Sequence, residues 1–133
     1  MSITKSSTPQ TLEIPVTGPG DANRLFIFTG IVEVNIQGTG GEWRRETLKI
    51  EIDRPFAASL YQKGIGTISL AAISNKNEAV NAGWAIESVS VARDANSNKP
   101  VLTAQIAVRD KDGLLETVAY EVFVLAKVKT TTK

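Results

Sequence analysis

Hydrophobic and polar residues alternate with a period of two through most of the chain between residues 48 and 128. The cleanest stretch is residues 102–108, in which every second residue is apolar and most of the intervening residues are polar. Successive side chains of an extended chain point to opposite faces, so this alternation predicts half-buried antiparallel strands. The pattern therefore predicts an all-β protein.

Links rich in glycine, asparagine and aspartate divide the chain into six or seven expected strands. The expected ranges are 12–16, 24–36, 43–53, 65–73, 84–93, 102–108 and 114–128. This number and spacing, with one helical turn expected within residues 56–63, predicts an antiparallel β-sandwich. We expect residues 11–128 to form this single domain, residues 1–10 a flexible N-terminal arm, and residues 129–133 a polar tail.

Several local features are expected from residue type alone. Gly30 interrupts an apolar strand and predicts a bulge or bend, and the inward phase changes between Ile86 and Val89, which predicts a second bulge. Residues 38–41 and 110–113 have the composition of hairpin turns, with the closing glycine of the second in the left-handed conformation. The last strand is apolar on both sides, so we expect it to be central in its sheet or covered on both faces.

The net charge of the chain is too small to attract a polyanion such as a nucleic acid or an anionic membrane surface. The 133 residues include 15 Lys and Arg against 14 Asp and Glu, which gives a net charge of +1. We therefore expect no nucleic-acid partner and no membrane partner, since no apolar run approaches the roughly 20 residues that span a bilayer. The first eight residues lack the apolar core of a secretory signal, so we expect synthesis in the cytoplasm.

The chain contains no histidine and no cysteine. This removes the commonest general base, the commonest metal ligands and the thiol nucleophile, so we expect a protein without catalytic activity and without a cofactor. Glu51 and Asp53 are expected on the solvated face of one strand and do not converge as an acid and base pair would. Asp94 opens a loop that begins like a calcium loop, but Lys99 and Pro100 stand where glycine is required.

Candidate ligand-binding residues lie on the expected strand 43–53. Strict alternation points Trp43, Arg45 and Lys49 outward on one face, where an exposed indole beside cations can stack on a sugar, a base or a partner's side chains. The alternative is that Trp43 covers the end or edge of the sheet. Trp84 and Phe123 are expected to pack in the core.

Two stretches, residues 26–28 and 123–125, are apolar on both faces. A two-layer sandwich buries only one face of each sheet, so the surplus apolar surface must be covered by loops or by another subunit. We favour another subunit and expect a homo-oligomer.

From about residue 48 to residue 126 the order of features resembles the H-type lectin domain. The features that carry the resemblance are the stretches 52–56, 67–71, 88–91, 101–109 and 118–126, with an Asn-rich loop and the turn at residues 112–113. The resemblance implies an antiparallel sandwich, trimers and sugar binding. This chain has Phe123 where the family usually carries tryptophan, and it lacks the histidine of some members. Of the family's binding positions only Arg109, with the neighbouring turn, occupies a comparable place.

Two functions are therefore expected from the sequence. The first is a carbohydrate-binding, lectin-like module, for which the candidate residues are Trp43, Arg45, Lys49 and Arg109. The second is a structural subunit of a multimeric particle, such as a phage or tail component, favoured by the polar arm and by the apolar surplus.

Overall fold

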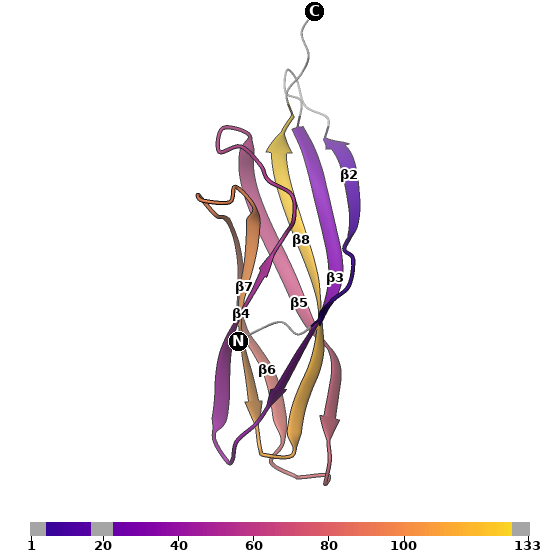
Figure 1. The fold of residues 1–133 in the computed structure, drawn as a ribbon, viewed down its shortest axis with the longest axis vertical. Helices are drawn as coiled ribbons and strands as arrows, with labels where there is room; N and C mark the ends of the chain where they lie inside the picture. The colour runs from indigo at the N-terminus through magenta and orange to yellow at the C-terminus, as the bar shows by residue number, and fades with distance from the viewer. Residues whose placement is uncertain (1–4, 17–22, 129–133) are drawn as a thin grey trace, which may run out of the picture.

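The computed structural model describes residues 5–16 and 23–128, which form two antiparallel β-sheets packed face to face (Figure 1). The predicted all-β sandwich is thus confirmed. The strands are β1 Lys5–Ser6, β2 Gln10–Val16, β3 Asn23–Gln37, β4 Trp43–Glu51, β5 Tyr61–Asn75, β6 Gly83–Arg93, β7 Pro100–Arg109 and β8 Gly113–Lys127. The described residues contain no helix, and therefore none long and apolar enough to cross a membrane.

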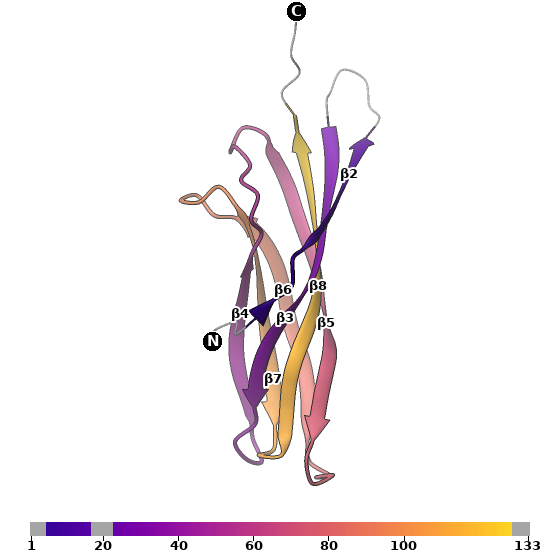
Figure 2. The same ribbon diagram turned by 45° about the vertical axis from the view of Figure 1, so that its right-hand side comes forward.

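The first sheet contains β1, β2, β3, β8 and β5, and the second contains β4, β7 and β6. Within the first sheet β8 lies between β3 and β5, so the prediction that the last strand is central is confirmed. β1 and β2 both pair with the remaining edge of β3, one after the other along its length. Figure 2 shows the two sheets from the side, with β2 at the margin of the first.

The core lies between the inner faces of the two sheets. It is filled by the inward residues that alternation predicts, including the four inward apolar residues of β7, and by Phe26 and Phe28 of β3. Phe56 closes one end, with its ring edge-on to Phe26 at 5.1 Å between centroids. Trp84 packs against this core and donates a hydrogen bond from Nε1 to the Leu114 carbonyl oxygen at 3.1 Å, as expected for a core residue.

Both expected hairpins, at residues 38–41 and 110–113, are wrong. The first joins β3 to β4 and the second joins β7 to β8, and in each case the two strands belong to different sheets. The links pack on each other, since the Asp110 amide donates to the Gly40 carbonyl oxygen at 2.7 Å and the Gly38 amide donates to the Gly113 carbonyl oxygen at 2.9 Å. The left-handed residue of the second link is Asp110, with φ of 79°, and not Gly113.

The bulge expected near residues 86–89 is confirmed by a register shift between Ile86 and Ser88. The bulge expected at Gly30 is wrong, because Gly30 pairs with Tyr120 in unbroken register. The irregularity of β3 lies between residues 33 and 36, where Asn35 takes a φ of 48°. Gly30 has a packing role, since a Cβ there would lie 2.5 Å from the Tyr120 hydroxyl oxygen.

The single helical turn expected within residues 56–63 is confirmed by one hydrogen-bonded turn at residues 57–61. The Leu60 and Tyr61 amides donate to the Ala57 carbonyl oxygen, and β5 begins at once at Tyr61. Of the expected flexible arm, residues 5 and 6 form β1, and Gln10 begins β2; its flexibility stays a prediction. The expected tail, residues 129–133, lies outside the described residues.

Glycines on the inner face of β5 let β6 and β7 approach closely. A Cβ at Gly66 would lie 2.7 Å from Val91 Cγ2 and 3.0 Å from Leu102 Cδ1. Leu102 is fully buried, so this space cannot open without shifting the core. We predict that Gly66→Ala lowers the free energy of unfolding by about 1–3 kcal/mol through overpacking.

Urea denaturation measures this loss, and Gly40→Ala is the matched control. A Cβ at Gly40 would meet no atom within 4 Å, so its effect should stay within about 0.5 kcal/mol. Equal midpoints for the two variants would contradict the packing described for β5.

Candidate functional site

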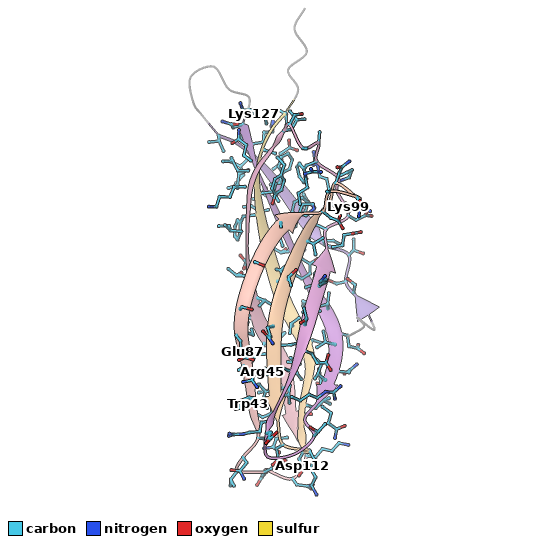
Figure 3. All side chains as sticks on the ribbon, turned by 90° about the vertical axis from the view of Figure 1, so that its left-hand side faces the viewer. Trp43, Arg45, Glu87, Lys99, Asp112 and Lys127 are labelled. Atoms are coloured by element: carbon cyan, nitrogen blue, oxygen red, sulfur yellow. The ribbon has the colours of Figure 1, made fainter. Side chains whose placement is uncertain are left out.

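Trp43 lies at the start of β4 on the outer face of the second sheet, meaning the face that points away from the first sheet (Figure 3). Strand register places Trp43 beside Arg109 of β7, and Arg109 beside Gly83 of β6. The end of the indole reaches Gly83, since a Cβ there would lie 2.7 Å from Trp43 Cη2. Glycine is therefore required for the ring to lie across the sheet.

Arg109 holds the indole from a second direction. Its guanidinium carbon lies 4.9 Å from the centroid of the Trp43 ring, within cation–π range. The guanidinium is fixed in turn, because Nε donates a hydrogen bond to the Asn81 carbonyl oxygen at 2.6 Å. Trp43 is half-buried by these contacts. The expected candidates Trp43 and Arg109 thus lie together, and the indole covers the end of the sheet.

Arg45 lies two residues further along the same face and forms an ion pair across the sheet. Its Nε donates to both carboxylate oxygens of Glu87 on β6, at 2.9 and 3.2 Å (Figure 3). Ala107 lies beside Arg45 in register, and its small side chain leaves room for the pair to bridge β7. A partly exposed pair of this kind contributes roughly 0–1 kcal/mol. Because the Arg45 guanidinium is already paired with Glu87, fewer of its N–H groups are free to bind a ligand.

Lys49 does not join this group. It lies six residues from Trp43, about 20 Å along an extended strand. It lines a separate depression of about 330 Å³ together with Glu51, Arg93, Asp94 and neighbouring residues. The four expected candidates therefore divide into Trp43, Arg45 and Arg109 at one end and Lys49 toward the other.

The acidic residues considered for chemistry have structural partners. Lys99 Nζ lies 3.0 Å from Asp53 Oδ1 and 3.6 Å from Glu51 Oε1, and the hydrogen bond to Asp53 and its charge raise the pKa of Lys99. Asp94 accepts a hydrogen bond from the Asn96 amide at 2.8 Å and shapes the loop between β6 and β7. Among the described residues, no three His, Cys, Asp or Glu side chains gather as a metal site would require.

The outer face of the first sheet carries two features that no single strand predicts. The first is an apolar face made of two adjacent rows across the four longer strands of the sheet. One row is Leu12, Ile27, Phe123 and Ile65, and the other is Ile14, Leu25 and Leu125, ending at Lys63. Leu12 and Ile65 are more than half exposed, at 56% and 55%. Phe123, expected in the core, lies half-buried on this outer face.

The second feature is a hydroxyl-lined depression of about 440 Å³ beside the apolar face. Its lining includes the small residues Gly30 and Ala119. Its polar lining is contributed by Ser7, Thr8, Gln10, Thr29, Thr67, Ser69 and Glu121. Alternation along the strands indicates that Thr29, Thr67 and Glu121 face outward, whereas Ser7 and Thr8 lie in the link between β1 and β2. Their assembly into one surface follows from the register of four strands.

No protein-family model, no curated protein and no solved structure matches this chain. The resemblance to the H-type lectin domain therefore stays a prediction.

The contacts of Trp43 predict a measurable contribution to stability. We expect Trp43→Ala to lower the free energy of unfolding by about 1–2 kcal/mol, because the half-buried indole loses its contacts with Gly83 and Arg109. Urea denaturation provides the measurement. Thr47→Ala, at an exposed position of the same strand face, should change it by less than about 0.5 kcal/mol. A Trp43→Ala protein as stable as the Thr47→Ala protein would contradict a covering role for the indole.

Proposed function

We propose that the protein is a non-enzymatic structural subunit that assembles with copies of itself through the apolar face of the first sheet. The observation that carries this proposal is the continuity of that face across β2, β3, β8 and β5. Monomeric soluble proteins rarely expose a contiguous apolar surface of this kind, and such surfaces mark interaction sites. A multimeric particle, such as a phage or tail component, is the kind of assembly proposed.

The second sheet provides the comparison. Its outer face carries Arg45, Thr47, Lys49 and Glu51 on β4, with Gln105 and Thr103 beside them on β7. That face is polar and charged, as expected for a sheet face that contacts water. The same domain thus has one outer face suited to solvent and one suited to burial, and this difference supports a specific contact.

A second copy of the chain is the partner that this face fits. An apolar surface is complementary to itself, whereas a surface of one charge sign repels its own copy. Lys63 is the only charged residue in the two rows, at the end of one of them. The net charge of +1 also places little repulsion between copies. The H-type lectin resemblance implies three copies, and the proposal requires at least two.

The proposal predicts that a charge on the apolar face dissociates the assembly. Ile65→Lys should weaken self-association about tenfold or more, because an unpaired ammonium would be buried between the subunits. Sedimentation velocity over a concentration series measures this effect. Ile65 is more than half exposed within the subunit, so the substituted subunit should keep the parent's fold, which far-UV circular dichroism measures.

Thr47→Lys is the matched control, because it places the same charge on an exposed outer position of the other sheet. It should assemble as the parent protein does. Equal assembly of the Ile65→Lys protein and the parent would contradict the proposal, and so would equal loss of assembly in the two lysine variants.

Carbohydrate binding is the second candidate function, and the hydroxyl-lined depression is the observation that favours it. Sugars are bound by convergent hydroxyl, amide and carboxylate groups beside an apolar surface, and the depression has all of these. Within the described residues the Glu121 carboxylate has no ion-pair partner, so its oxygens are available as acceptors. The depression fits a neutral sugar better than the Trp43 region, where the indole and both arginines are already engaged.

Two variants test whether a glycan binds in the hydroxyl-lined depression or beside Trp43. On a panel of neutral glycans, a ligand bound by the parent protein should bind Thr67→Val roughly tenfold more weakly, since one hydrogen bond is lost. Trp43→Ala should bind it with unchanged affinity. The opposite result would place the sugar on the second sheet, and a panel without any bound glycan would remove this candidate.

A further inference from the structure

The N-terminal segment, residues 5–16, is attached to the domain through one strand. Its two strands, β1 and β2, pair with β3 and with no other described strand. All seven residues of β2 are exposed, so neither face of this strand is buried. No described side chain of the segment belongs to the hydrophobic core. The segment therefore adds hydrogen bonds along an edge and little burial.

The contacts that hold the segment are specific to β3. The Ser7 amide donates to the Ile31 carbonyl oxygen at 2.9 Å, and the Ile31 amide donates back to Ser7 Oγ at 3.0 Å. Glu13 forms an ion pair with Arg24 at 3.4 Å. The pairing is also divided, because the register of β1 is offset by one residue from that of β2. Two short ladders hold less firmly than one continuous ladder.

The edge of β3 needs a strand. β3 carries the buried core residues Phe26 and Phe28. Without the segment, the amides and carbonyls of β3 that point away from β8 between Asn23 and Glu33 would lack strand partners. An unpaired edge of this length recruits another strand. The free edge of β2 is protected in comparison, because Pro15 lacks an amide hydrogen and hinders addition of a further strand.

We propose that in the assembled protein the N-terminal segment of one copy pairs with β3 of a second copy, in the register described above. This inference rests on the proposed self-assembly. The same residues make the same contacts in the exchanged arrangement, so exchange sacrifices no core packing. Leu12 and Ile14 of the segment also belong to the apolar face, which continues the assembly surface across the exchanged strand.

Engineered disulfides test the exchange in the full chain, which has no cysteine of its own. Pro15 and Arg24 are opposite each other in the β2–β3 register, at a Cα separation typical of antiparallel pairs and suited to a disulfide. They lie on the side of the sheet away from the apolar face, so contact between two apolar faces does not bring them together. The test protein carries both Pro15→Cys and Arg24→Cys.

After oxidation, exchange predicts that most of this protein migrates as covalently linked dimers or larger species on a non-reducing denaturing gel. The control carries Thr47→Cys and Gln105→Cys, a β4–β7 pair that should form its disulfide within one chain. Single-chain migration of both proteins would overturn the exchange. Light scattering on the same samples separates the two proposals, because an assembled protein with intrachain disulfides overturns only the exchange, and a monomer overturns both.

Discussion

Burial of the inward-facing side chains between the two sheets is the interaction on which the rest of the structure depends. Alternating residues of β3, β8, β4 and β7 supply most of this core, and nearly all of them are fully buried. Because side chains alternate strictly along a strand, the choice of the inner face also determines what each strand presents outward. The outer faces of the domain are therefore a direct consequence of the core.

This consequence differs between the two sheets. The outward positions of β4 and β7 are charged, polar or small, and at one end Trp43, Arg109 and Gly83 form a packed row. The outward positions of β2, β3, β8 and β5 are apolar in two adjacent rows. The first arrangement is complete within one subunit. For the second we propose that another surface covers it, and for this reason the function proposed for the protein is assembly.

Much of the fold follows from local pattern, and the pairing of strands does not. The alternation over residues 102–108 correctly predicts the buried strand β7, and the phase change near Ile86 correctly predicts a bulge. The links at residues 38–41 and 110–113 were expected to be hairpins, because their glycine and aspartate content fits a turn in either setting. Whether a turn joins paired strands or crosses to the other sheet depends on long-range contacts that composition does not encode.

The candidate site was likewise predicted only in part from the sequence. Alternation predicts that Trp43, Arg45 and Lys49 point outward, but the contacts of Trp43 with Arg109 and of Arg45 with Glu87 depend on register across β7 and β6. The apolar surplus of residues 123–125 is likewise visible in the sequence. Its union with Leu12 and Ile65 into one face required the alignment of four strands.

The mass of the unmodified protein in solution, measured by light scattering over a range of concentrations, tests the central claim most directly. Coverage of the apolar face by a second copy predicts a mass that is a multiple of the 14.3 kDa chain. A mass of 14.3 kDa at every concentration would contradict it, since the apolar face of the first sheet would then be exposed to water in the functional state.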